Sequence, residues 1–169
     1  MRKILIAYAT KCGSTGETAR AIGRILGDAG YVVDLQPARE VRNLKGYDAL
    51  VLGTAIRMGK PIGEARRFVR KHGKEMKRLA VAYFSLGLGP TKNSDEAHQE
   101  SLGFLASLRS VHQPQVEAVF AGVLDFDKLP SWWRKMAAMD KEGTMVEGDF
   151  RDWDEINAWA AGLPAQLGL

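Results

Sequence analysis

Apolar residues along this chain fall into short runs that alternate with amphipathic stretches. The runs at 4–8 and 48–53 are almost wholly apolar, which is typical of strands buried on both faces of a parallel sheet. Similar runs predict strands at 79–86 and 116–124. A further run, at 31–35, alternates between apolar and polar residues, so we expect that strand to lie nearer an edge of the sheet.

Between these runs, apolar residues recur at helical spacing. The spacing predicts helices over 15–29, 61–77, 95–111 and 152–167. Pro61 suits the first turn of the second helix, because its fixed φ is already helical. The residues expected to face inward on the last three helices are Ile62, Ala65, Val69, His72, Met76, Leu102, Leu105, Ala106, Leu108, Trp153, Ile156, Ala160, Leu163 and Leu167.

The alternation of strands and helices indicates the fold class. It favours an α/β protein in which a five-stranded parallel sheet is covered by helices on both faces. The stretch at about 125–151 interrupts the alternation and is too long for a simple connection. Since the chain has 169 residues, we expect a single domain over 1–169 that carries an insertion at about 125–151, between the last strand and the last helix.

The composition is ordinary for a globular protein, with 46% apolar and 26% charged residues, and it excludes a disordered, collagenous or coiled-coil chain. The formal net charge of +4 is too weak to indicate nucleic-acid binding. The single cysteine, Cys12, excludes an internal disulfide and a cysteine-cluster metal site. The three histidines lack the spacing of metal ligands, so we predict no metal site.

The positive charge is concentrated in residues 57–78, whereas 125–155 is net acidic. The basic segment suits a solvated helix face, and it also suits docking of an acidic partner or of an anionic membrane surface. Arg57 stands apart from the other basic residues because it lies in the connection after a strand. It is the best candidate for contact with an acidic group, the alternative being a salt bridge across the loop.

A signal peptide and a membrane span are both absent from the sequence pattern. The basic residues 1–3 precede an apolar run that is too short for a signal peptide, and no run approaches the ~20 apolar residues of a bilayer span. We therefore expect a cytoplasmic protein.

A short amphipathic segment at 132–139 combines tryptophans and methionines with basic neighbours. It could cover the last strand, form a dimer surface or contact the inner face of the membrane.

The connection after the first strand carries candidate binding chemistry, because parallel α/β proteins bind ligands at the carboxyl ends of their strands. Residues 10–16 contain three hydroxyls and two glycines and open directly into a helix. Backbone N–H groups at a helix N-terminus bind phosphate, and the hydroxyls of Thr10, Ser14 and Thr15 can add donors. The alternative is that Ser14 or Thr15 only caps the helix.

Other phosphate-binding motifs do not fit this loop. Glu17 follows Gly16 where a Walker loop needs lysine, and Gly13 and Gly16 do not form the glycine fingerprint of dinucleotide-binding proteins. A phosphatase loop needs an arginine six residues after its cysteine, where this chain has Thr18. We therefore interpret Cys12 as a residue of a phosphate loop rather than as a catalytic nucleophile.

The pattern Thr10-x-Cys12-Gly13-x-Thr15 resembles the phosphate loop of flavodoxins, (S/T)-x-T-G-x-T, with Cys12 in place of the middle hydroxyl. The resemblance implies the flavodoxin-like three-layer fold with strand order 2-1-3-4-5, and it implies FMN as the cofactor. It places the FMN phosphate in the loop formed by Thr10, Lys11, Cys12, Gly13, Ser14 and Thr15.

Later segments narrow this resemblance to one group. Residues 53–59 and 83–88 are similar to the segments G-(A/T)-(A/S)-I-R-x-G and (Y/F)-S-x-x-L of the flavodoxin-type protoporphyrinogen oxidase group. The last strand at 120–124, the tryptophan pair at 132–133 and the helix start at 152–156 resemble the same group. The further cofactor-binding residues that this resemblance implies are Thr54, Ala55, Ile56, Arg57, Met58, Gly59, Ser85, Leu86, Gly87 and Leu88.

The chain departs from electron-carrier flavodoxins, which stack aromatic side chains on the flavin. Neither 54–60 nor 86–92 contains an aromatic residue. A weakly stacked ring with an exposed edge would suit hydride exchange with bulky substrates. The ring would then rest on aromatic residues of the insertion or on Ile56, Met58, Leu86 and Leu88.

The resemblance implies an FMN-dependent oxidoreductase that moves electrons from a reduced organic substrate to a quinone or another acceptor. The alternatives are an electron-transfer flavodoxin serving a redox partner protein, and a phosphate-binding module without redox use. No catalytic side chain is predicted, because the flavin would supply the chemistry. The expected partners are a small molecule, a quinone or a redox protein but no nucleic acid, with membrane contact through 125–151 and a homo-oligomer left open.

Overall fold

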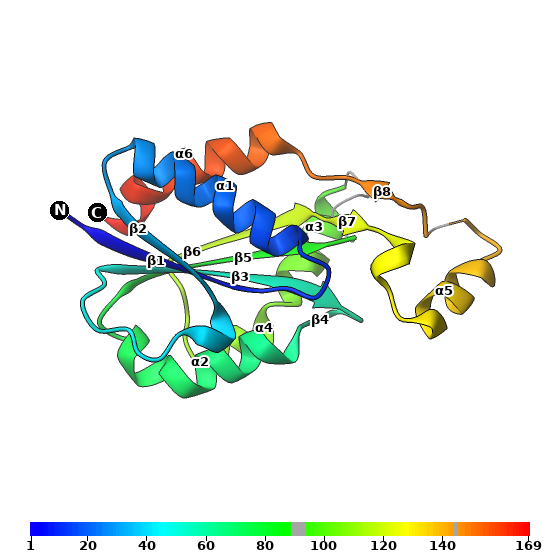
Figure 1. The fold of residues 1–169 in the computed structure, drawn as a ribbon, viewed down its shortest axis with the longest axis horizontal. Coiled ribbons are helices and arrows are strands. Elements are labelled where there is room, and N and C mark those ends of the chain that lie inside the picture. The colour runs from blue at the N-terminus through cyan, green and yellow to red at the C-terminus, as the bar shows by residue number, and fades with distance from the viewer. Residues whose placement is uncertain (89–93, 144) are drawn as a thin grey trace.

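A parallel sheet forms the centre of the structure, which is a computed structural model and describes residues 1–88, 94–143 and 145–169. The strands lie in the order β2-β1-β3-β5-β6 (Figure 1). Numbered by these five parallel strands alone, the order is 2-1-3-4-5, which confirms the predicted topology. The strands are β1 (Lys3–Ala9), β2 (Val32–Pro37), β3 (Ala49–Arg57), β5 (Ala80–Gly87) and β6 (Val116–Ala121).

Helices cover both faces of this sheet, as predicted (Figure 1). One face carries α1 (Ser14–Asp28) and α6 (Trp153–Leu167). The opposite face carries α2 (Gly63–Met76) and α4 (Ala106–Arg109), with α3 (Asp95–Gly103) beside β6. A short 3-10 helix, Ala38–Glu40, follows β2.

The alternation of side chains along each buried strand divides the interior into two apolar cores. On β1, Ile4 and Ile6 pack in the core under α1 and α6, whereas Leu5 and Ala7 pack in the core under α2 and α4. All four residues are fully buried. This two-sided burial is what the unbroken apolar run of the sequence indicates.

Strand β3 runs further than the sequence pattern predicts. It continues to Arg57 and turns back at Met58 and Gly59 into β4 (Lys60–Pro61), which pairs with it antiparallel. The two turn residues have φ of 51° and 70°, and two successive positive φ values are typical of a two-residue hairpin. The prediction that Pro61 lies in the first helical turn is therefore wrong, because Pro61 belongs to β4 and α2 begins at Gly63.

The helix predicted over 95–111 is two helices. The N–H groups of Phe104 and Leu105 bond three residues back, which tightens the chain after α3 and turns it into α4. Leu105 and Leu108 are buried as expected, whereas Ala106 is exposed. On the last helix, Trp153 is also exposed rather than inward-facing.

The strand predicted over 116–124 is also in two pieces. After β6, the chain passes Gly122 and forms β7 (Val123–Leu124), which pairs antiparallel with β8 (Gly148–Asp149). Between them lie a 3-10 helix, Phe126–Lys128, and α5 (Ser131–Ala138). Figure 1 shows α5 beyond the carboxyl ends of the sheet strands. The residues of 125–151 thus lie at the edge of the sheet where the predicted binding loops lie.

None of the described helices combines the length and apolar character needed to cross a membrane.

A close approach between β3 and β5 gives a test of this packing. A Cβ on Gly53 would overlap the ring of Phe84, which is fully buried. We expect Gly53→Ala to lower the free energy of unfolding by about 1–3 kcal/mol, because the ring has no room to move. Gly27→Ala is the control, since no atom lies within 4 Å of its Cβ position in α1. It should raise stability by roughly 0.5–1 kcal/mol. Urea denaturation measures both, and equal effects would contradict the packing described.

Candidate functional site

A pocket of about 240 Å³ opens at the carboxyl ends of β1, β3 and β5. The loop after β1, the β3–β4 hairpin and the end of β5 converge on it, as the order of the strands requires. Most of the predicted site residues lie together around this pocket. Those that line it are Thr10, Lys11, Cys12, Ser14, Ala55, Ile56, Arg57, Met58, Gly59, Leu86, Gly87 and Leu88.

Four predicted site residues do not line the pocket. Gly13 is the N-cap of α1, and Thr15 lies fully buried in the first turn of that helix. Thr54 is fully buried in β3, where its hydroxyl donates to the carbonyl of Ala55 at 2.9 Å. Ser85 is buried in β5. Gly13 and Thr15 therefore lie at the end of the loop after β1, where α1 begins. Thr54 and Ser85 lie inside the sheet, beneath the pocket-lining residues of β3 and β5.

Several residues of the pocket wall are not among the predicted site residues. Phe104 lies against Gly59, and Trp133 contributes an aromatic side chain from α5. Trp133 agrees with the expectation that the insertion could supply an aromatic contact. The sequence pattern predicts a continuous helix through Phe104, and only the glycine before it signals the turn that brings Phe104 to the pocket. The remaining residues of the wall that were not predicted are Gly122, Val123, Leu124 and Leu129.

The loop after β1 presents unpaired donors at the start of α1. Gly13, at φ 96°, accepts from the N–H of Glu17, and no side chain caps the helix. The alternative that Ser14 or Thr15 only caps the helix is therefore wrong. Among the described residues the buried hydroxyl of Thr15 has no hydrogen-bond partner. Uncapped N–H groups together with an unpaired hydroxyl are typical of a phosphate-binding helix N-terminus.

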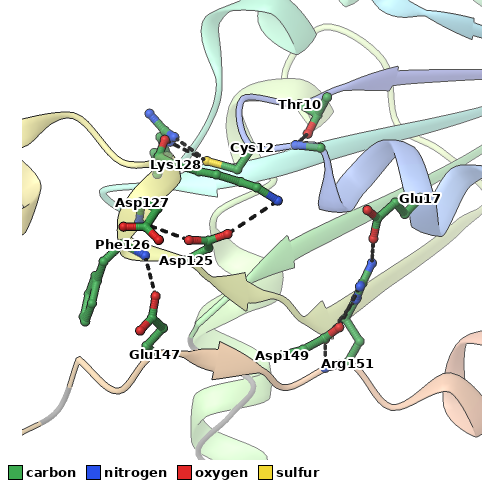
Figure 2. A network of polar contacts seen from close by, with 12 residues as sticks. Thr10, Cys12, Glu17, Asp125, Phe126, Asp127, Lys128, Glu147, Asp149 and Arg151 are labelled. Atoms are coloured by element: carbon green, nitrogen blue, oxygen red, sulfur yellow. Dashed lines mark hydrogen bonds and ion pairs between the residues drawn. The ribbon is translucent and has the colours of Figure 1, made fainter.

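The loop keeps its shape through local contacts. The hydroxyl of Thr10 accepts from the N–H of Gly13 at 2.9 Å (Figure 2). Gly16 lies against the Tyr8 ring, which a Cβ would approach to 2.9 Å, so a larger residue there would displace the helix start. The loop is thus preformed before any ligand binds.

Arg57 crosses the pocket from the hairpin to this loop. Its guanidinium Nη2 donates to the Cys12 sulfur at 3.3 Å, and the Cys12 thiol donates to the backbone carbonyl of Lys128 at 3.6 Å. A salt bridge across the loop is the alternative that the sequence leaves open for Arg57. The structure shows a contact between Arg57 and the Cys12 sulfur instead. Cys12 therefore joins the hairpin and the loop after β1. It also contacts the segment 125–151 through Lys128 (Figure 2).

A second hollow, of about 200 Å³, lies next to the loop and shares Cys12, Ser14 and Val123 with the first. Arg151 lies in its wall and forms ion pairs with Asp149 at 2.7 Å and with Glu17 at 2.9 Å (Figure 2). The hydrogen bond from Arg151 holds the pKa of the Asp149 carboxyl below its usual value. The same carboxyl raises the pKa of the Arg151 guanidinium.

Exposed apolar side chains lie on the hairpin tip and on α5. Met58 at the hairpin tip is 77% exposed, and α5 has no buried residue. On α5 and just after it, the exposed apolar side chains are Trp132, Met136 and Met139. The interpretation of 132–139 as a cover for the last strand is therefore wrong for Trp132, since its ring is half exposed.

The residues present fit a phosphorylated ligand with a flat apolar part. The first turn of α1 and the Thr15 hydroxyl suit the phosphate, and the apolar wall of the pocket suits a planar ring. Within residues 1–88, 94–143 and 145–169, no three potential ligands from His, Cys, Asp and Glu gather around a common point for a metal.

Comparison with known proteins defines the class. The family model described as Flavodoxin domain matches residues 5–149, so the chain belongs to this family. Among curated proteins, it is 26% identical to protoporphyrinogen IX dehydrogenase (quinone) from Escherichia coli strain K12, over 94% of this chain and 92% of that protein. It is 27% identical to the protein of the same name from Leishmania major, over 96% of this chain and 75% of that protein.

Solved structures show the same fold. A short-chain flavodoxin associated with a non-canonical PDU bacterial microcompartment matches with a TM-score of 0.63 and 14% identity, over 99% of both chains. A Fusobacterium nucleatum flavodoxin mutant bound to flavin mononucleotide matches with a TM-score of 0.56 and 14% identity, over 99% of this chain and 96% of that one. The identities are low, so these likenesses concern the fold.

Two threonines of the loop give opposite expectations for the ligand-free protein. Thr10→Val removes the acceptor of the Gly13 N–H and should lower the free energy of unfolding by about 1 kcal/mol. Thr15→Val replaces a buried hydroxyl that lacks a partner by a methyl group, so it should leave stability unchanged or raise it. Urea denaturation of both variants checks the pair. A loss of stability in Thr15→Val equal to that in Thr10→Val would contradict the assignment of an unpaired hydroxyl.

Proposed function

We propose that this protein is an FMN-dependent oxidoreductase that takes electrons from a bulky reduced organic substrate and passes them to a quinone. The observation that carries the proposal is an unpaired, fully buried Thr15 hydroxyl at an uncapped helix start, next to an open apolar pocket. Its membership in the Flavodoxin domain family supports the same cofactor.

The residues around the pocket divide the work of holding FMN. The first turn of α1 and Thr15 would bind the phosphate, and Thr10 holds the loop in shape. Apolar side chains from the hairpin and β5 would support the ring. FMN supplies the exchange of two electrons with the substrate, and the protein supplies binding, orientation and electrostatics.

The walls of the pocket suit a large donor. The pocket side of the hairpin offers Ile56 and Met58 rather than an aromatic stack, and Met58 is largely exposed. Phe104 and Trp133 enter the wall from other elements. A ring held in this way keeps an edge open to a substrate. Arg57 and Lys11 in the wall would attract carboxylates of such a donor.

The curated relatives named protoporphyrinogen IX dehydrogenase (quinone) indicate which donor and acceptor to try first. We propose protoporphyrinogen IX as the donor and a quinone as the acceptor for this chain. In each turnover two electrons and two protons leave the donor, and the same number convert the quinone to a quinol.

Anaerobic reduction of the FMN-loaded protein tests this function. Protoporphyrinogen IX should bleach the flavin absorbance, and a quinone added afterwards should restore it. The flavin-free protein treated in the same way is the control for direct reaction between the two reagents. Absence of bleaching in the loaded protein would exclude this donor.

An electron-carrier role is the second candidate, and the charge on α2 favours it. The exposed side chains of this helix include Arg67, Arg70 and Lys74, and the ion pairs found among the described residues do not include them. A redox protein with an acidic surface would dock there. The same anaerobic assay separates the candidates, because a carrier would react with its protein partner and not with the porphyrin donor.

The exposed face of α5 leads to a further proposal, contact with an anionic membrane. Its apolar side chains lie beside Lys128, Arg134 and Lys135, a combination that suits the interface of a bilayer.

We expect the double variant Trp132→Ser/Trp133→Ser to lose most binding to vesicles of phosphatidylserine and phosphatidylcholine in a flotation assay. Val111→Ser, which changes an exposed apolar residue elsewhere, should bind as the unmodified protein does. Equal binding by all three proteins would remove the proposal.

A further inference from the structure

Arg151 ties the end of the segment 125–151 to the first turn of α1. Its side chain is only 7% exposed. Its Nη1 donates to the carboxylate of Glu17 at 2.9 Å and to the backbone carbonyl of Ser14 at 3.3 Å. Its Nε and Nη2 donate to the two oxygens of Asp149, at 2.9 Å and 2.7 Å (Figure 2). A buried cation thus bridges two parts of the chain that lie more than 130 residues apart in sequence.

The contact with Ser14 acts on a donor of the phosphate site. The carbonyl of Ser14 and the N–H of Thr15 belong to one planar peptide unit, in which they point in opposite directions. This carbonyl also accepts from the Thr18 hydroxyl at 3.0 Å, and the additional hydrogen bond from a cation polarises the N–H of the unit further. The Thr15 N–H therefore becomes a stronger donor, beside the unpaired Thr15 hydroxyl.

The contact with Glu17 removes an opposing charge. Glu17 lies in the first turn of α1, so its carboxylate lies close to the place where a phosphate dianion would bind. The negative charges of the Glu17 carboxylate and of the phosphate would repel each other there. Arg151 pairs this carboxylate at 2.9 Å and neutralises it. Asp149, bonded to the other side of the guanidinium, holds Arg151 in position.

We propose that Arg151 is a positioning residue for the flavin phosphate, which it serves through the Ser14 carbonyl and the Glu17 carboxylate. The proposal rests on the proposed function, because it takes FMN as the ligand. The donors at Nε and Nη1 and one at Nη2 are engaged by Ser14, Glu17 and Asp149, so the guanidinium acts through these groups rather than as the main phosphate ligand.

Lys128 gives the segment 125–151 a second contact with the loop after β1. The carbonyl of Lys128, near the start of the segment, accepts from the Cys12 thiol (Figure 2). Arg151, at the end of the segment, contacts Ser14 and Glu17. The segment thereby couples the loop after β1 to the β7–β8 ladder that carries Asp149.

Binding of FMN and of riboflavin to the flavin-free protein tests the proposal, since riboflavin lacks the phosphate. Titrations followed by flavin fluorescence give both dissociation constants. Arg151→Met should weaken FMN binding at least about tenfold, because it leaves the Glu17 carboxylate unpaired near the phosphate and removes the cation that polarises the Ser14–Thr15 peptide. Its affinity for riboflavin should stay within about twofold of the unmodified protein. Arg151→Lys should recover part of the FMN affinity, because the charge near Glu17 is kept.

Arg109→Met is the matched control. Arg109 also pairs with a carboxylate, Glu117 at 3.0 Å, and also donates to a backbone carbonyl, that of Leu102, but on the opposite face of the sheet. It should lower stability without changing the ratio of the FMN and riboflavin dissociation constants. Thermal unfolding of each flavin-free variant records the loss of stability separately from binding.

The double variant Arg151→Met/Glu17→Gln tests the charge argument. Removal of the unpaired carboxylate should return part of the FMN affinity that Arg151→Met loses. A fall in stability with an unchanged FMN-to-riboflavin ratio in Arg151→Met would overturn the proposal, as would an equal change of ratio in Arg109→Met. If the unmodified protein binds neither flavin, the proposed function itself fails, and this result is distinct from the others.

Discussion

The pairing of β1 between β2 and β3 is the constraint on which the candidate site depends. Since β1 has a parallel neighbour on each side, the chain leaving β1 returns through α1 on one face of the sheet, and the chain leaving β3 returns through α2 on the other. The two connections diverge at the carboxyl ends, where Ala9 pairs with Thr54. A crevice opens between them, and the loop after β1 and the β3–β4 hairpin form its sides.

Much of this arrangement could be predicted, because the strongest signals in the sequence are burial signals. The apolar runs around Ile6 and Val51 are short and bounded by turn residues, which favours interior strands of a covered sheet, and the strand order agrees with that expectation. The loop from Thr10 was predicted from hydroxyls and glycines that precede a helix. Its residues and those of the hairpin do lie around one pocket, although their binding of FMN remains a proposal.

What could not be predicted depends on contacts between segments distant in sequence. The hairpin at Met58 requires an extended strand to turn back at an unusual positive φ, and propensity alone gives little sign of it. Phe104 reaches the pocket because the chain tightens after Gly103, where a continuous helical pattern had been expected. Arg151 has no local signal at all, since its partners in α1 lie more than 130 residues earlier. The segment 125–151 therefore gains its meaning only in three dimensions.

We propose that the loop after β1 holds the phosphate of FMN while the pocket beside the hairpin holds its ring. A crystal structure of the protein with FMN tests it most directly. We expect the phosphate to be hydrogen-bonded to the Thr15 hydroxyl and to N–H groups of the first turn of α1, with the flavin ring against Met58 and Leu88. A flavin bound elsewhere, or a phosphate that leaves the Thr15 hydroxyl unpaired, would contradict it.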